Sequence, residues 1–232
     1  MEKQKYTAII LAAGSGKRMN SKVHKQYLII QDRPVLYYSL KAFEDSAVDE
    51  IVLVVGKGEE KFCRKEIVDK YGISKVKAIV EGGKERYHSV FEGLKQTSDA
   101  DYVLIHDGAR PFVNQDIIRR CMQEVQKYQA CVVGMPVKDT IKIADEEGYA
   151  KQTPDRKNVW MIQTPQTFSY ALIYEAYEEM LKTEDAAITD DAMVLERTKG
   201  KKSKLIGGSY RNIKITTPED LLIANVYLQH PE

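Results

Sequence analysis

Small residues and cations follow the first apolar run of the chain, and together they could bind phosphate groups. Residues 6–11 are almost continuously apolar, as in a strand that is buried on both faces. Small side chains let a ligand approach the backbone, and glycine adopts the torsion angles of a tight turn. Exposed backbone N–H groups beside two cations form a site for a polyphosphate. The sequence therefore predicts a phosphate-binding loop, which contains Ala12, Ala13, Gly14, Gly16, Lys17 and Arg18.

Two well-known phosphate-binding motifs do not fit this loop. A P-loop places Ser or Thr after Gly-Lys, but Arg18 stands there, and Leu11 stands where the first glycine belongs. The dinucleotide fingerprint requires a third small residue, where this chain has Met19. The loop is thus of a third kind. Taken alone, it could also be an ordinary glycine turn with two solvated cations.

Two further loops with glycine and charge follow apolar runs. Residues 82–86 come after the run 76–80, and residues 106–111 come after the run 102–105. Asp107 in the last loop suits Mg²⁺, which prefers one or two carboxylates together with water and substrate phosphates. The alternative is that this carboxylate makes hydrogen bonds only within its own turn.

The order of elements decides whether these loops meet. Apolar runs alternate with helical patterns through residue 137, which predicts an α/β fold with a mostly parallel sheet and right-handed crossovers. Ligands of such sheets bind beyond the carboxyl ends of the strands, so the three loops should converge at one edge. We predict strands at 6–11, 27–30, 51–55, 76–80, 102–105 and 130–137, and helices at 34–44, 59–71, 89–96 and 116–128.

The pattern changes after residue 137. Residues 140–153 read as a β-hairpin with a turn at 145–148. An isolated hairpin is marginal in water, so it either packs against another subunit or is a flexible flap. Beyond it we predict strands at 158–163, 204–206 and 212–215, and helices at 169–181 and 190–198, with a last helix that Thr217 and Pro218 begin and that ends near residue 228.

Composition limits the class of protein. With 232 residues, 43% of them apolar, the chain can form one α/β domain with its own core. A net charge of +1 gives no general affinity for nucleic acid or for a membrane surface. Three scattered cysteines suggest neither a zinc site nor a disulfide framework, and no signal peptide or spanning segment is evident, so a cytoplasmic location is expected. The four histidines are not grouped as metal ligands, and no nucleophile–base spacing is evident.

Several motifs together carry a family resemblance. Residues 11–19 resemble the signature loop of the sugar-phosphate nucleotidylyltransferases. Within that group, the ordered matches resemble the 2-C-methyl-D-erythritol 4-phosphate cytidylyltransferases from residue 6 to about residue 228. These matches are residues 25–28, 82–83, 85–86, 89–90, 106–112, 136–140, 164–166, 188–192 and 212–221.

The resemblance implies a fold, a reaction and a set of roles. The fold would be a Rossmann-like nucleotidyltransferase domain over residues 1–232, with an arm at about 138–158 that forms a homodimer. The substrates would be CTP and a sugar-alcohol phosphate, and the products CDP-methylerythritol and pyrophosphate, with Mg²⁺ as cofactor. By position, the nucleotide-binding residues would be Ala12, Ala13, Gly14, Gly16, Gly83 and Ser89. Arg18 and Lys25 would stabilise the transition state, and Asp107 would bind the metal. The residues that position the sugar phosphate would be Arg110, Thr140, Thr164 and Lys214, joined by Arg156 from the partner subunit.

The sequence departs from the family pattern at two positions, and two other functions remain as alternatives. His24 stands where many relatives have proline, and Lys84 where relatives often carry aspartate. The nearest alternative is a ribitol-5-phosphate cytidylyltransferase, although Ala13 and Ala109 favour the methylerythritol group. A non-catalytic nucleotide-binding domain on the same scaffold is the more distant alternative, because fold does not determine function.

Overall fold

A seven-stranded sheet forms the centre of the computed structural model, which describes residues 3–14, 24–182 and 188–230. The strand order is β11-β7-β10-β6-β1-β4-β5, and only β10 runs antiparallel to its neighbours. The mostly parallel sheet predicted from the sequence is confirmed. Its strands are β1 (Tyr6–Ala12), β4 (Glu50–Val55), β5 (Val76–Glu81), β6 (Tyr102–Asp107), β7 (Ala130–Pro136), β10 (Trp160–Ser169) and β11 (Lys204–Gly207).

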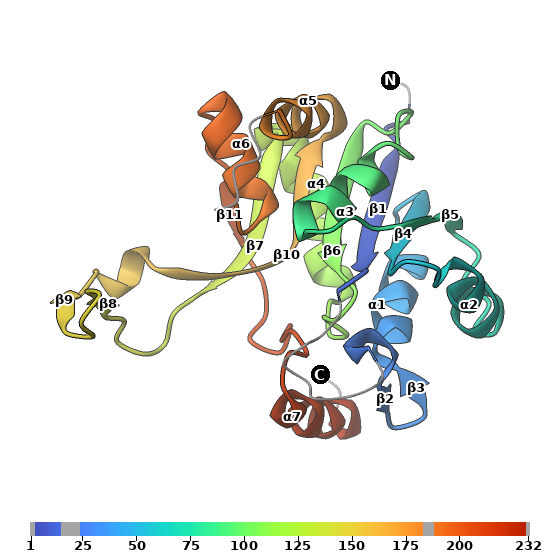
Figure 1. Ribbon diagram of the computed structural model, residues 1–232, viewed down its shortest axis with the longest axis horizontal. Helices are drawn as coiled ribbons and strands as arrows, with labels where there is room; N and C mark the ends of the chain where they lie inside the picture. Colours follow the sequence, from blue (N-terminus) through green and yellow to red (C-terminus); the bar gives the residue numbers. More distant parts are fainter. Residues whose placement is uncertain (1–2, 15–23, 183–187, 231–232) are drawn as a thin grey trace.

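Helices cover both faces of this sheet (Figure 1). Successive β1 side chains point to opposite faces. Ile10 packs in one hydrophobic cluster with α1, α2 and α4, and Ile9 packs in the other with α3, α5 and α6. The helices are α1 (Val35–Glu44), α2 (Glu60–Cys63), α3 (Arg86–Leu94), α4 (Gln115–Tyr128), α5 (Tyr170–Met180), α6 (Asp191–Lys199) and α7 (Pro218–Gln229). None of the helices in the described part of the chain combines the length and apolar character needed to cross a bilayer.

The pairing register of β1 with β4 and β6 brings the carboxyl ends of these strands to the same level. Leu11 near the end of β1 lies opposite Asp107 at the end of β6 and opposite Val54 of β4. The segments that follow β1, β5 and β6 therefore leave the sheet at one edge. This is the convergence that the sequence predicted, as far as the described residues extend.

Several predicted elements differ from the structure. The helix at 59–71 is a short α2 that continues as a π-helix, η3 (Arg64–Asp69), and the strand at 27–30 is a 3₁₀ turn, η2 (Lys25–Tyr27), followed by β2 (Ile29–Ile30). Pro34 lies in β3 (Arg33–Pro34) and is the N-cap of α1 rather than its first residue. The predicted strand at 212–215 is wrong, because these residues pair with no strand of the described part of the chain; the Ile215 N–H donates to the carbonyl of Ala109 at 2.8 Å.

The strand predicted at 158–163 is longer than expected. β10 continues through Pro165 to Ser169. The pairing of β10 with β7 shifts register between Ile162 and Gln166, so the proline falls in an irregular stretch where a missing N–H is tolerated.

The hairpin prediction is confirmed. β8 (Ile143–Ala144) pairs with β9 (Ala150–Gln152), and the Asp145 carboxylate accepts hydrogen bonds from the N–H groups of Glu147 and Tyr149. We call residues 138–158 the arm. The arm extends away from the sheet between β7 and β10 (Figure 1), and its hairpin strands are exposed along their whole length.

Candidate active site

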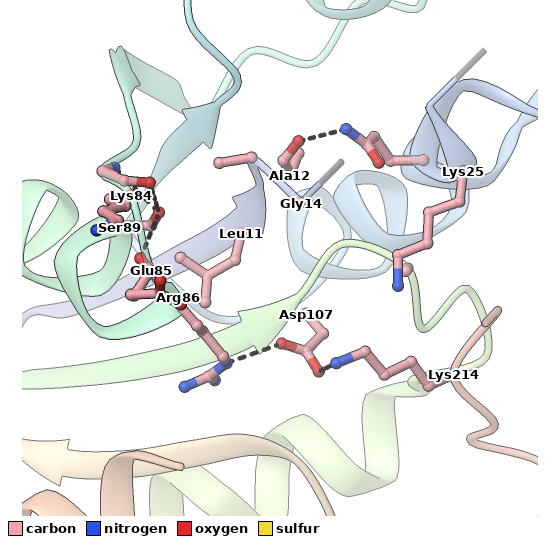
Figure 2. Close-up of a pocket in the computed structure, with 14 residues that line it drawn as sticks. Leu11, Ala12, Gly14, Lys25, Lys84, Glu85, Arg86, Ser89, Asp107 and Lys214 are labelled. Carbon is pink, nitrogen blue, oxygen red and sulfur yellow. Dashed lines mark hydrogen bonds and ion pairs between the residues drawn. The ribbon is translucent and has the colours of Figure 1, made fainter. Parts of the chain in front are cut away.

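A cavity of about 360 Å³ lies at the carboxyl edge of the sheet. The ends of β1 and β6 contribute to its walls, together with the loop between β5 and α3, the start of α3, the turn η2 and the segment before α7 (Figure 2). We call it the first cavity. The predicted site residues that line it are Ala12, Ala13, Gly14, Lys25, Gly83, Ser89, Asp107 and Lys214.

The double-glycine loop closes one wall by close packing. A Cβ on Gly82 would lie 2.6 Å from the Cβ of Ala13 and 2.6 Å from the Oγ of Ser89, so a larger residue does not fit there. The Gly83 N–H donates to Ser89 Oγ at 3.1 Å. Glu85 then caps α3 through a capping box with His88. The loop is thus held rigidly beside the Ala-Ala-Gly segment.

Lys25 reaches the cavity from η2, which is tied to both neighbouring segments. Buried Gln26 donates to the carbonyl of Ala12 at 2.5 Å. The Tyr27 hydroxyl donates to Glu59 Oε2 at 2.7 Å, and the Nδ1 of His24 lies 2.8 Å from Glu59 Oε1. The His24 departure therefore supplies a contact to α2 in place of the rigidity of a proline.

Asp107 is the centre of charge in the site. Its Oδ2 lies 2.8 Å from Lys214 Nζ and 3.8 Å from Arg110 Nε, and its Oδ1 lies 3.4 Å from Arg86 Nε. Figure 2 shows Arg86 and Lys214 approaching Asp107 from opposite sides. Burial raises the pKa of the Asp107 carboxyl, but the three cations outweigh burial and hold that pKa well below its usual value. Asp107 is therefore an ionised carboxylate.

The donor set around Asp107 suits a metal that brings most of its own ligands. Among the described residues, no group of three or more His, Cys, Asp or Glu side chains is placed to hold a metal ion. A single ionised carboxylate beside a cavity fits Mg²⁺, which takes its remaining ligands from water and substrate phosphates. It does not fit a metal that needs a closed protein cage.

A chain of hydrogen bonds fixes the backbone at Asp107. The Asp107 N–H donates to Thr164 Oγ1 at 3.1 Å, that hydroxyl lies 3.0 Å from His106 Nδ1, and His106 Nε2 lies 3.3 Å from the carbonyl of Arg110. Complete burial lowers the pKa of His106 to about 3, so its ring is neutral. The carbonyl can only accept, so Nε2 carries the ring proton and the Thr164 hydroxyl donates to Nδ1.

A second cavity, of about 250 Å³, adjoins the first. Arg86, Asp107 and Lys214 line both cavities. Arg110 lies in the second, where its Nη1 donates to the carbonyl of Asn212 at 2.7 Å. The remaining residues of the second cavity are Ile162, Gln163, Thr164, Gln166, Thr189 and Asp190.

Some predicted site residues are not brought to these cavities. Thr140 and Arg156 lie in the arm, are exposed and line neither cavity, and Arg156 Nη1 donates to the carbonyl of Lys138 at 3.0 Å. Gly16 and Arg18 lie outside the described residues. Two further residues of the site, Gln26 and Arg86, had no predicted role, although both lie within motifs of the family resemblance.

Comparisons with known proteins identify the family. The family model for 2-C-methyl-D-erythritol 4-phosphate cytidylyltransferase matches residues 6–230. A protein of that name from Lachnoclostridium phytofermentans is 51% identical over 226 residues, which are 97% of each chain. Another, from Lachnospira eligens, is 53% identical over 225 residues, 96% of this chain and 99% of the relative.

Solved structures agree with the sequence relatives. The structure of 4-diphosphocytidyl-2C-methyl-D-erythritol synthase from Anaerococcus prevotii superposes with a TM-score of 0.86 at 38% identity and covers 98% of this chain and 97% of its own. That of 2-C-methyl-D-erythritol 4-phosphate cytidylyltransferase from Thermus thermophilus gives a TM-score of 0.77 at 29% identity, over 95% of this chain and 98% of its own. The ordered motifs, the fold and these matches agree over nearly the whole chain, which belongs to the 2-C-methyl-D-erythritol 4-phosphate cytidylyltransferase family of nucleotidyltransferases.

Proposed function

We propose that the two adjoining cavities are the site where this chain transfers the cytidylyl group of CTP to 2-C-methyl-D-erythritol 4-phosphate and releases pyrophosphate. The observation that carries this proposal is the set of three charged side chains, Arg86, Asp107 and Lys214, that line both cavities. A transfer reaction needs two substrates whose reacting groups meet, and here two cavities meet at a cluster of charge.

The first cavity suits the nucleotide. Small residues at Ala12, Ala13 and Gly14 let a ligand lie against the backbone, and the wall at Gly83 is closely packed against α3. Lys25 and the amino terminus of α3 add positive charge for phosphates. We assign the second cavity, with Arg110, to the sugar phosphate.

The reaction depends on the positioning of the two substrates and on neutralisation of their negative charge, and it does not need a protein side chain as a general base. The acceptor is a phosphate monoester, which is already largely dianionic at neutral pH because its second pKa is about 6. An acceptor oxygen attacks the α-phosphorus of CTP in line, and the bond to pyrophosphate breaks. Lys25 and Lys214 reduce the repulsion between the two anions. We keep the same role for Arg18.

Mg²⁺ is the metal we propose for this site, held by Asp107. When bound, it would act as a Lewis acid and neutralise the negative charge that develops on the phosphates. In this structure Lys214 contacts one oxygen of Asp107. We propose that Lys214 instead donates a hydrogen bond to the triphosphate when CTP and the metal are bound.

The arm is proposed to complete the site in a homodimer. It carries exposed apolar side chains, Ile143 at 46% and Tyr149 at 72%, which another protein surface could cover. Arg156 on the arm of one protomer would then contact the sugar phosphate bound by the other. We also propose that residues 1–232 form one domain and that the protein acts in the cytoplasm.

A pyrophosphate-release assay tests the proposal. Each of the four ribonucleoside triphosphates is combined with 2-C-methyl-D-erythritol 4-phosphate and with ribitol 5-phosphate. We expect release only with CTP, Mg²⁺ and the methylerythritol phosphate. Preference for ribitol 5-phosphate would revive the alternative substrate, and no release with any pair would favour a non-catalytic nucleotide-binding domain. The control variant is Asp107→Asn, which keeps the size of the side chain and removes its charge.

A further inference from the structure

Arg86 binds two carboxylates at once, and the second one lines neither cavity. Its Nη1 and Nη2 each donate to an oxygen of Asp191 at 2.8 Å, whereas its Nε lies 3.4 Å from Asp107. The bond to Asp191 is therefore bidentate, which fixes both the position and the plane of the guanidinium. The residues come from distant parts of the chain, since Arg86 begins α3 and Asp191 begins α6.

Asp191 is itself held rigidly. It is fully buried, and the Tyr177 hydroxyl donates to its Oδ1 at 2.5 Å. Gln166 of β10 accepts from the Ala192 N–H at 2.9 Å and donates to Asp190 Oδ2 at 3.1 Å, so both neighbours of Asp191 are tied to the sheet. Asp190 also caps α6 by accepting from the Met193 N–H.

The paired guanidinium remains open to ligands. The Arg86 side chain is 29% exposed and lies where the two cavities join. Burial alone would lower the pKa of Arg86, but Asp191 and Asp107 raise it well above its usual value. Three of its five N–H groups take part in the contacts to the two carboxylates. Because Nη1 and Nη2 are already bonded to Asp191, Arg86 does not form a bidentate pair with Asp107.

We propose that Asp191, supported by Tyr177, is a positioning residue that fixes Arg86 at the junction of the two cavities, where Arg86 contacts the phosphate groups of the bound substrates. This inference rests on the proposed function. If it is right, losing Asp191 lets Arg86 pair with Asp107, and the charge in the site is misplaced although the residues that line the cavities are all still present.

The test compares steady-state kinetics and thermal unfolding of Asp191→Asn, Tyr177→Phe and Arg86→Ala with the wild type. We expect Asp191→Asn to lower kcat by about 10-fold to 100-fold, as for other partners that orient a functional group. KM for CTP should change only a few-fold, because the contact is made mainly in the transition state. Tyr177→Phe should act in the same direction with a smaller effect. In an Arg86→Ala background, Asp191→Asn should lower kcat less than about 2-fold further.

A control variant separates positioning from plain stability. Asp49→Asn removes a partly buried carboxylate that accepts from the Tyr6 N–H at 2.9 Å, at the opposite end of β1. It should lower the unfolding temperature and leave kcat unchanged.

Three outcomes would overturn the inference. In the first, the folded Asp191→Asn variant keeps the kcat of the wild type. In the second, the double variant loses kcat by the product of the losses in Asp191→Asn and Arg86→Ala. In the third, the wild type itself is inactive. Only the third also contradicts the proposed function. If Asp191→Asn does not fold, Tyr177→Phe decides, because it removes one hydroxyl from an otherwise intact core, and an unchanged kcat in that variant rejects the proposal.

Discussion

The charge of single side chains around Asp107 sets what this site can do. Lys214 and Arg110 surround one oxygen of Asp107 and Arg86 faces the other. Because Coulomb interactions between partly buried groups are stronger than in water, this cluster presents a concentrated field to any anion in either cavity. Lys25 adds a cation from a different segment.

Removing either lysine should affect turnover more than nucleotide affinity. We expect Lys25→Ala and Lys214→Ala each to lower kcat on the order of 10²-fold to 10³-fold, because the charges act where negative charge develops. Steady-state kinetics measures kcat, and calorimetry measures the Kd of CTP. Lys127→Ala, which changes an exposed lysine in the last turn of α4, is the matched control and should behave as the wild type. Equal losses in CTP affinity and in kcat/KM would argue for ground-state binding only.

Elements position these side chains through a few close contacts. The loop between β5 and α3 touches the Ala-Ala-Gly segment with no space for a Cβ at Gly82. We therefore expect Gly82→Ala to push the two walls of the first cavity apart and to raise KM for CTP by at least 10-fold. Thermal unfolding of the variant checks that the fold is kept. An unchanged KM would mean that the nucleotide does not use this wall.

The end of α1 is tied to the segment just before β5 by the charged side chain of Glu44, which makes part of the stability pH-dependent. The Glu44 carboxylate accepts from the N–H and hydroxyl of Ser74 and from the Lys75 N–H. Burial raises the pKa of Glu44, but these hydrogen bonds outweigh burial and lower that pKa below its usual 4.5. The folded state therefore gains stability from Glu44 above pH 4.5, and this gain is lost as pH falls through the folded pKa.

Replacing Glu44 tests this link. Glu44→Gln should lower the free energy of unfolding by about 1 kcal/mol at pH 7, because hydrogen bonds to a charged acceptor are lost. The difference from the wild type should shrink as pH falls from 4.5 through the lowered pKa of Glu44 in the folded state, because the wild-type carboxylate then becomes protonated as well. Urea unfolding at pH 7 and pH 3.5 measures it. A difference that stays constant with pH would show that charge plays no part.

Elements with a strong local signal were predictable, and those set by distant contacts were not. The buried strands β1, β4 and β6 and the capped helix α7 agree closely with the sequence prediction, because apolar runs and the Thr217–Asp220 capping box are local features. The continuation of β10 past Pro165 depends on a register shift against β7, which no local pattern shows. In the site, glycine and charge predicted the edge of the sheet, but the partnership of Arg86 with Asp191 spans 105 residues and needed the fold.

The arm extends away from the sheet of its own chain (Figure 1). Its hairpin is exposed and extends from the domain (Figure 1), which is costly for a marginal two-stranded unit unless another surface covers it. In the proposed homodimer, a second copy of the chain would cover the hairpin and would bring Arg156 into a neighbouring site.

Mixing two inactive variants tests the shared site. Arg156→Ala subunits mixed with Lys25→Ala subunits should partly recover activity, because one site of each hybrid dimer takes intact residues from both chains. Pyrophosphate release after co-refolding measures the recovery, and the unmixed variants treated in the same way are the controls. No recovery in dimers shown to be hybrid would mean that each site is built from one chain.

A structure with CDP-methylerythritol and Mg²⁺ bound would test most directly whether the two substrates meet at Asp107. We predict that the diphosphate lies between Arg86 and Lys214 with the metal on Asp107. The cytosine should lie against Gly82 and Gly83 in the first cavity, and the methylerythritol should extend into the second. A product bound away from Asp107, or one confined to a single cavity, would contradict the account that two substrates meet at this carboxylate.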